Sequence, residues 1–202
     1  MNTKVVLFTL IVVVLSGIKS FADETADYFE IAIAYYEEKQ YAKAVETLLK
    51  KFESEDSFGA LLLLPWILST CPDDNIRNGR LAMMYAHKLH FQTLLFLASD
   101  IKQGKSDWLS NLCVPWLMYA SAYAELAEFD SAVFCQKIAL LLTELIKNVD
   151  RKQRLQKRMR AVLKLYQNGI PLRTNVISIG ELSDAWIEKI LNADDVRKID
   201  FE

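Results

Sequence analysis

The chain has 202 residues, with 24 Lys and Arg against 26 Asp and Glu, so its formal net charge at pH 7 is −2. This length allows a single domain with a substantial core, and the mild acidity gives no basis for nucleic-acid binding. Three cysteines, Cys71, Cys113 and Cys135, are too few for a disulfide scaffold. We expect them to be small apolar packing residues, with an intramolecular disulfide as the alternative.

The first element is an apolar segment at the N-terminus. Lys4 gives a basic start, Val5 to Ile18 is largely apolar, and Ser20-Phe21-Ala22 ends in small residues. This layout is typical of a secretory signal peptide that covers residues 1–22 and is cleaved before Asp23. An uncleaved anchor is the alternative, although a spanning helix needs roughly 20 apolar residues. We therefore expect an exported protein, periplasmic or extracellular in a bacterial cell envelope, that meets the membrane only if this segment stays attached.

Two apolar stripes at helical spacing follow, one from Tyr28 to Tyr36 and one from Tyr41 to Phe52, with an interruption at Gln40-Tyr41. Two helices of this length joined by a tight turn form an antiparallel hairpin. The pattern returns between Trp116 and Ala139, where AYAELAEFDSAV aligns with the earlier AYYEEKQYAKAV. Internal similarity between helix pairs is typical of helical-repeat proteins.

The region between the two pairs is also predicted to be helical, as is most of the C-terminal part. The expected helices are Ser57–Thr70, Arg77–Leu89, Phe91–Lys102, Arg151–Gln167 and Glu181–Leu191. The stretch LSTCPDDNIRNG, residues 68–79, forms a corner between the first two of these, because Pro72 disfavours helical geometry at Cys71. Asp73 and Asp74 are expected near the positive end of the helix that follows, where acids are favourable.

Both hairpins resemble the tetratricopeptide repeat, in which small residues let the two helices of a pair approach closely. The matching positions are Tyr28, Ile31, Ala32, Tyr35, Ala44 and Leu48 in the first copy, then Trp116, Tyr119, Ala120, Tyr123, Ala132 and Ala139 in the second. WILSTCPDDNIRNGRLAMMYAHK and LYQNGIPLR also resemble the corner and the closing motif of a bacterial variant of this repeat. The chain departs from the family at Lys39 and Ala127, where the turns lack the usual glycine, and it has no helix-ending proline after either copy.

The resemblance implies an all-α, TPR-like right-handed α-solenoid of about three irregular helix hairpins with capping and tail helices. The helical domain would cover residues 23–173, followed by a linker and a C-terminal tail helix over 174–202. Repeats of this kind are scaffolds, so the expected function is that of an exported, non-catalytic adaptor that binds another protein or peptide. The alternative is a binding protein for a small apolar or lipidic ligand held between helices.

In this family the first helix of each pair lines a groove that holds the partner. The corresponding residues of this chain are Phe29, Ile33, Tyr36, Glu37, Leu117, Ser121, Ala124 and Glu125. The groove would be apolar with a few acids and would suit an amphipathic helix. Two further possibilities remain, that the tail or the helix near Phe91 fills this groove.

The helix Arg151–Gln167 carries a basic stripe, Lys157, Arg160 and Lys164, on the face away from its apolar residues. The stripe is interpreted as a solvated surface, as a docking surface for an anionic partner, or as the contact for an acidic tail that folds back. In the last case Trp186, Ile187, Ile190 and Leu191 would supply most of the docking energy, because exposed ion pairs contribute only ~0–1 kcal/mol each.

Two groupings of reactive residue types could form a catalytic or metal-binding site. Cys71 with His87 or His90 as a base would make a thiol nucleophile, and the two histidines with Cys71, Asp73 or Asp74 would make a metal site. We favour packed or solvated side chains in both cases. The sequence thus predicts no catalytic residue, no metal and no cofactor.

Overall fold

The computed structural model describes residues 22–55, 57–103, 111–176 and 182–198, and these residues contain eight α-helices and no strand. The α-helices are α2 (Ala22–Glu37), α3 (Tyr41–Glu55), α4 (Phe58–Thr70), α5 (Gly79–Lys102), α6 (Cys113–Glu125), α7 (Phe129–Leu142), α8 (Val149–Gln167) and α9 (Asp184–Asn192). Two short 3-10 helices are η2 (Thr143–Leu145) and η4 (Val196–Lys198). The all-α fold class is confirmed. Nearly all of the expected signal peptide, residues 1–21, lies outside the described residues.

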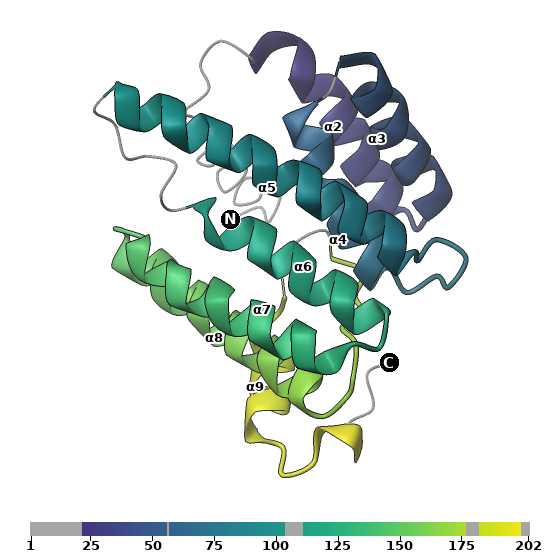
Figure 1. Cartoon of the computed structure of the whole chain (residues 1–202). Helices are drawn as coiled ribbons and strands as arrows, with labels where there is room; N and C mark the ends of the chain where they lie inside the picture. Colours follow the sequence, from purple (N-terminus) through teal and green to yellow (C-terminus); the bar gives the residue numbers. More distant parts are fainter. Residues whose placement is uncertain (1–21, 56, 104–110, 177–181, 199–202) are drawn as a thin grey trace.

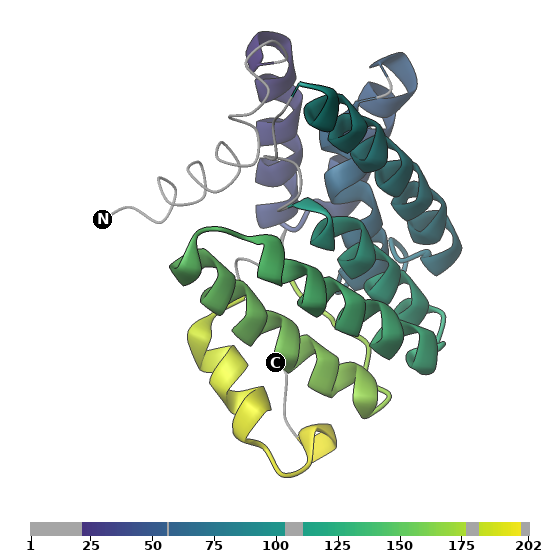
Figure 2. The same ribbon diagram turned by 60° about the vertical axis from the view of Figure 1, so that its left-hand side comes forward.

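The helices follow one another through the molecule in chain order. Each helix packs against the next, from α2–α3 to α8–α9, and α4 also contacts α2 and α6. Figure 1 accordingly shows α2 and α3 at one end of the molecule and α8 and α9 at the other, and Figure 2 shows the same order from the side. The small residues expected where helices meet closely have no exposed surface; they are Ala32, Ala44, Ala120 and Ala132.

Three helices end in the same kind of turn, with one residue in the left-handed region. The φ angles are 61° at Lys39, 60° at Ala127 and 71° at Gly169. In each turn the next residue donates its N–H to the carbonyl five residues earlier, which closes a Schellman motif. The N···O distances are 2.8 Å for Gln40–Tyr35, 2.9 Å for Glu128–Tyr123 and 3.0 Å for Ile170–Leu165. Lys39 and Ala127 thus hold a left-handed conformation that glycine adopts more readily, and the predicted end of α8 at Gln167 is confirmed.

The expectation of two helices between Arg77 and Lys102 was wrong. The structure has a single helix there, α5, which runs for 24 residues from Gly79 to Lys102. Neither glycine nor proline occurs between Arg80 and Lys102 to break this helix. At the expected break, Leu89 and Thr93 are both buried, and the Thr93 hydroxyl donates to the Leu89 carbonyl at 2.8 Å. Packing of this face onto the neighbouring helices favours continuous helix through the expected break.

Candidate functional site

The corner between α4 and α5 is a compact turn. The Cys71 N–H donates to the Ile67 carbonyl at 3.1 Å, and the Asn75 N–H donates to the Asp73 carboxylate at 2.9 Å, which forms an Asx turn. Asn78, not an aspartate, caps α5, because its side chain accepts the Leu81 N–H. The predicted corner is confirmed, but the expected placement of Asp73 and Asp74 at the helix start was wrong.

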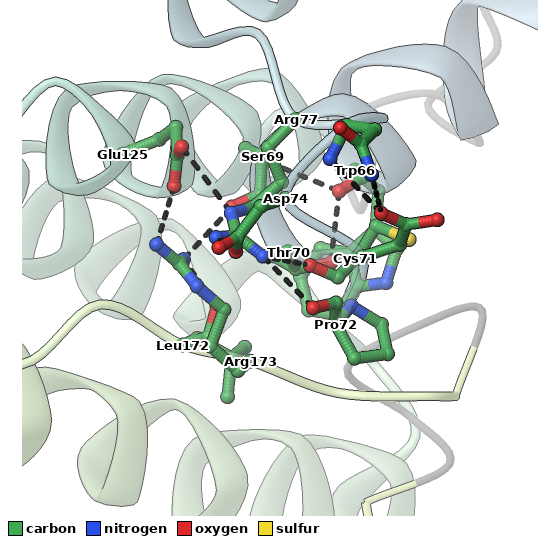
Figure 3. Close-up of polar contacts among 12 residues, drawn as sticks. Trp66, Ser69, Thr70, Cys71, Pro72, Asp74, Arg77, Glu125, Leu172 and Arg173 are labelled. Carbon is green, nitrogen blue, oxygen red and sulfur yellow. Dashed lines mark hydrogen bonds and ion pairs between the residues drawn. The ribbon is translucent and has the colours of Figure 1, made fainter. Parts of the chain in front are cut away.

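Arg77, in this corner, belongs to a cluster of three charged residues (Figure 3). Glu125, the last residue of α6, lies between two arginines: its Oε1 accepts from Arg77 Nε at 3.3 Å, and its Oε2 lies 2.6 Å from Arg173 Nη2. The second contact is an ion pair whose angle departs from that of a hydrogen bond. The Arg77 and Glu125 side chains are only 11% and 16% exposed. We call these three residues the Arg–Glu–Arg node.

The two arginines of the node also bind main-chain oxygens of the corner. Arg77 Nη1 donates to the Cys71 carbonyl at 2.7 Å and to the Pro72 carbonyl at 3.1 Å, and Arg77 also pairs with Asp74. Arg173 Nη1 donates to the Ser69 carbonyl at 3.3 Å. Burial lowers the pKa of Arg173, an effect that Arg77 adds to and Glu125 opposes. Both guanidinium groups thus make several contacts within the chain.

The chain after Arg173 continues along the same corner as an added layer. The Thr174 N–H donates to the Thr70 carbonyl at 2.9 Å, and the Thr174 carbonyl accepts the Tyr36 hydroxyl at 3.0 Å. The Trp66 indole N–H donates to the Val176 carbonyl at 3.1 Å. The corner and the end of the LYQNGIPLR segment therefore meet in space. In sequence, each of them resembles a motif of the same bacterial repeat variant. The hydrogen bonds between them join the corner to the 172–176 segment and stabilise the fold.

Most of the residues expected to line a groove are buried. Six of them have exposed fractions between 1% and 9%: Phe29, Ile33, Tyr36, Leu117, Ser121 and Ala124. Ser121 shows the reason, because its hydroxyl forms a 2.8 Å hydrogen bond with that of Ser69 across the α4–α6 contact. Of the other two, Glu37 is exposed at the end of α2, and Glu125 is the centre of the Arg–Glu–Arg node. In place of an open groove, the structure has helix-to-helix contacts at these positions.

Two of the three residues of the basic stripe on α8 contact the tail. Lys157 pairs with Glu188 of α9, and Lys164 donates to the carbonyls of Leu191 and Ala193 at 2.9 and 2.6 Å. Arg160, in contrast, is exposed. Among the three interpretations of the stripe, the structure selects the tail that folds back.

The docking of α9 rests on its apolar side chains. Ile187 and Ile190 have no exposed surface, while the ion pair between Lys157 and Glu188 is half exposed and solvent-screened. Burying two isoleucines contributes about 3–6 kcal/mol before the entropy of ordering the tail is subtracted. The described part of the tail, residues 182–198, is thus an integral part of the helical domain.

The three cysteines are free and buried, as expected for packing residues. Burial raises the pKa of the Cys71 thiol, against weaker opposing contributions from Asp73, Tyr36 and Arg77. Burial also raises the pKa of Cys113 and of Cys135 to about 11 in each case. A thiol nucleophile needs the opposite shift, so these environments favour inert side chains.

An open groove between α5, α6 and α7 was not predicted from the sequence. Its volume is about 680 Å³, and its lining residues are His87, His90, Trp116, Tyr119, Tyr123, Asp130, Ser131, Phe134 and Cys135. We call it the aromatic groove. The spacing of Trp116, Tyr119 and Tyr123 on one helix was the available signal, but these residues match the repeat pattern, and aromatic residues at helical spacing are usually core.

The histidines of the aromatic groove share one tyrosine. The Tyr119 hydroxyl lies 3.0 Å from His87 Nδ1 and 3.3 Å from His90 Nδ1. Because one hydroxyl proton can serve only one ring, the other ring must donate its own Nδ1–H. Burial lowers the pKa of His90, helped by His87, and burial raises the pKa of Tyr119 to about 12. His90 and Tyr119 are therefore both neutral at neutral pH.

The considered metal site is not assembled. No group of three His, Cys, Asp or Glu side chains with metal-binding geometry occurs among the described residues. His87 and His90 instead make ring contacts with Tyr119 at centroid distances of 5.0 and 5.7 Å. Their positions are explained by aromatic packing and by the shared hydroxyl.

Large apolar side chains on the surface gather near the aromatic groove. Of ten such side chains in the described residues, seven lie on α5 or α7: Met84, Phe91, Leu94, Leu95, Ile101, Phe134 and Leu141. Leu94 and Ile101 continue the helical stripe that begins with His87 and His90, and Phe134 and Leu141 share a stripe on α7. Within the described residues, no helix combines the length and the apolar character needed to cross a bilayer.

Comparisons of the chain with protein-family models, with curated proteins and with solved structures found no match. What these surfaces do must therefore be argued from their own geometry and chemistry.

Proposed function

We propose that the chain is a non-catalytic adaptor built as a TPR-like solenoid of three irregular helix hairpins. The pairs would be α2–α3, α4–α5 and α6–α7, with α8 and α9 as capping and tail helices. Two features support this arrangement. The first helices of successive pairs contact each other, as α2–α4 and α4–α6 do, and the turns within the α2–α3 and α6–α7 pairs are both Schellman motifs.

The non-catalytic part of the proposal rests on where the polar groups are used. The best-formed charged cluster, the Arg–Glu–Arg node, is occupied by the carbonyls of Ser69, Cys71 and Pro72 and by its own ion pairs. Groups of this kind fix the corner against the 172–176 segment. The surface that remains available for recognition is apolar and aromatic.

The observation that carries the proposal is the concentration of exposed apolar side chains on α5 and α7. A surface of this kind costs solubility and is retained in proteins mainly where a partner covers it. We therefore move the expected binding surface from the first helices of the pairs to the second helices. The surface has the aromatic groove at its centre and Phe91, Leu94, Leu95, Ile101 and Leu141 at its rim. We call it the α5–α7 face.

The proposed occupant is an amphipathic helix of another protein. Two helical stripes, one on α5 and one on α7, flank a depression lined by α6 side chains, which is the arrangement that accepts a helix through anchors at i, i+3, i+4 and i+7. Exposed large side chains in the groove and on its rim, such as Phe134 and Phe91, provide the anchors.

A cross-linking pull-down with matched variants tests this proposal. The face variant carries Phe91→Ser, Leu94→Ser and Phe134→Ser, and the control variant carries Ile31→Ser, Leu145→Ser and Val149→Ser. All six side chains are exposed, so neither variant should unfold the protein. We expect one or more specific proteins that the control variant retains and the face variant loses. Equal recovery by both variants would place binding elsewhere and contradict the proposal.

We further propose that the protein acts after export, in the bacterial cell envelope, as the signal-peptide pattern of residues 1–22 predicts. Mass spectrometry of the protein purified from its native cells tests this directly. A mature N-terminus at Asp23 is the expected result, and an intact N-terminus together with a cytoplasmic location would contradict it.

The size of the aromatic groove favours a second candidate function, the binding of a small apolar ligand. Its volume of about 680 Å³ lies within the range of small-molecule sites. Native mass spectrometry of the protein from its own cells distinguishes the two. A co-purified ligand whose removal lowers the Tm would favour the small-molecule function over the adaptor.

A further inference from the structure

We infer that the aromatic groove binds an organic cation, namely the lysine or arginine side chain of the partner helix. This inference rests on the proposed function, because it specifies the chemistry of the partner at the centre of the α5–α7 face. Three features of the groove carry it: the angles between its aromatic rings, the sign of its one carboxylate, and the place of the nearby basic residue.

The rings of the groove meet edge to face. Trp116 and Tyr119 have centroids 5.8 Å apart with an interplanar angle of 70°, and His90 lies 5.7 Å from each of them at 61° and 63°. Rings at such angles do not stack face to face, and all three line the groove, so a ring face that no neighbouring edge covers can border it. A cation in that space is attracted by the negative face of each ring it meets. Trp116 is half-buried, so part of its surface is accessible to a ligand.

The charges of the groove favour the same class of ligand. Asp130, in the first turn of α7, is exposed and lies in the groove, whereas no lysine or arginine occurs among its lining residues. The positive end of α7 offsets part of the Asp130 charge, so the aromatic faces should contribute more than the carboxylate. The imidazole of His90 is neutral at neutral pH because burial lowers its pKa, which removes a competing positive charge.

The nearby lysine of α5 is directed to another surface. Lys88 Nζ lies 4.5 Å from the ring centroid of Phe52 and 5.9 Å from that of Tyr85, and neither ring lines the groove. The cation–π contacts of the described residues thus lie within α5, between α2 and α3 and between α3 and α5, and none of them involves a ring of the aromatic groove.

Nuclear magnetic resonance of the tryptophan indole N–H groups provides the test. The full chain has four tryptophans, and the signal of Trp116 is assigned from the Trp116→Phe variant. The probes are N-acetyl-lysine methylamide and its uncharged counterpart N-acetyl-norleucine methylamide. We expect saturable shifts of the Trp116 signal with the lysine amide, and binding weaker by about tenfold for the norleucine amide. This comparison uses the unaltered protein, so no folding defect can produce it.

Two aspartate variants form a matched pair. Asp130→Asn removes the carboxylate from the groove, and Asp150→Asn changes the equivalent first turn of α8, where the acid is also exposed. We expect binding of the lysine amide to weaken by about threefold in the first variant and to stay unchanged in the second. An equal effect of both changes would show a general loss of negative charge and would overturn the inference.

The remaining outcomes separate this inference from the proposed function. Equal binding of the lysine and norleucine amides would overturn cation recognition and leave an apolar adaptor surface intact. Binding of choline alone, without the lysine amide, would overturn the assignment to a side chain of a partner. Selective binding of the lysine amide together with equal recovery of both pull-down variants would keep the cation site and contradict the adaptor.

Discussion

The Arg–Glu–Arg node and the aromatic groove are two regions of one domain, and they differ in what their side chains contact. In the node, both arginines bind carbonyls and a carboxylate of the same chain, and the segment after Arg173 adds further hydrogen bonds. In the groove, aromatic rings that range from buried to exposed line an open space of about 680 Å³. The node is therefore expected to determine stability and the groove to determine recognition, and substitutions in each should separate these two properties.

The largest effect is expected from Glu125→Leu, at the centre of the node. The change leaves Arg77, whose side chain is only 11% exposed, and the half-buried Arg173 without their shared carboxylate, which should destabilise the fold by about 3 kcal/mol. Urea unfolding followed by circular dichroism measures this difference. Glu188→Leu, which removes an exposed partner of Lys157, serves as the control and should change the free energy of unfolding only slightly. Similar effects of the two changes would show that the node is not a stabilising cluster.

A smaller loss is expected from Gly79→Ala, at the start of α5. A methyl group at this position would lie 2.8 Å from Leu126 Cγ and 3.2 Å from the Ala122 carbonyl oxygen. Because the second neighbour is backbone, the helices must shift, at a cost of about 2 kcal/mol despite the better helix propensity of alanine. Thermal unfolding tests this. A stabilised variant would mean that α5 and α6 separate easily at this contact.

A gain in stability is expected from glycine in the two hairpin turns. Lys39→Gly and Ala127→Gly each relieve a left-handed backbone, so each should stabilise the protein by about 1 kcal/mol. Gly169→Ala, at the third left-handed position, is the opposite change and should destabilise it by about 1 kcal/mol. Chemical denaturation of the three variants tests the sign. A loss of stability on introducing glycine would contradict the turn geometry.

A pH effect is expected at the histidine pair of the groove. The pKa of His90 is lower in the folded chain than in the unfolded chain, so the unfolded chain binds the proton more readily. The contribution of His90 to the free energy of unfolding is fully present above about pH 6.5, and it is lost as the pH falls toward the lower folded pKa. The difference between the free energies of unfolding at neutral and at mildly acidic pH should therefore be smaller in His90→Gln than in the unaltered protein. An unchanged pH dependence would show that His90 is solvated.

The smallest effect on stability is expected from Phe91→Ser on the α5–α7 face. This side chain is 65% exposed, so its removal should change the free energy of unfolding by less than about 0.5 kcal/mol. Binding of the partner should nevertheless decrease. Phe91→Ser thus affects binding and spares stability, whereas Glu125→Leu affects stability. Isothermal titration with a partner identified by the pull-down measures the binding. A strongly destabilised Phe91→Ser variant would show that this side chain belongs to the core.

The helices and their ends were largely predictable from the chain, because they depend on neighbours a few residues apart. The apolar stripe from Tyr41 to Phe52 became α3, and the tight turn expected before it is present and contains the left-handed residue Lys39. The break expected before Phe91 did not occur, because a periodic pattern with no glycine or proline is equally compatible with one long helix.

The candidate site was less predictable, since the same helical stripe can be buried or open. Leu117 and Ser121 were expected to line a groove and are covered by α4 and its neighbours, whereas Trp116 and Tyr123, on the same helix, remain partly accessible. Spacing along a helix shows which residues share a face. It does not show which other helix, if any, covers that face.

The sequence by itself determined most of the helices, the hairpin turns and the corner at residues 68–79, because hydrogen bonds and side-chain spacing within a few residues decide them. Only the tertiary structure decided that Arg173 meets Glu125, that α9 covers Lys157 and Lys164, and that the α5–α7 face remains open. These features depend on contacts between residues far apart in the chain. Their free energies come from burial and charge pairing that exist only once the helices have packed.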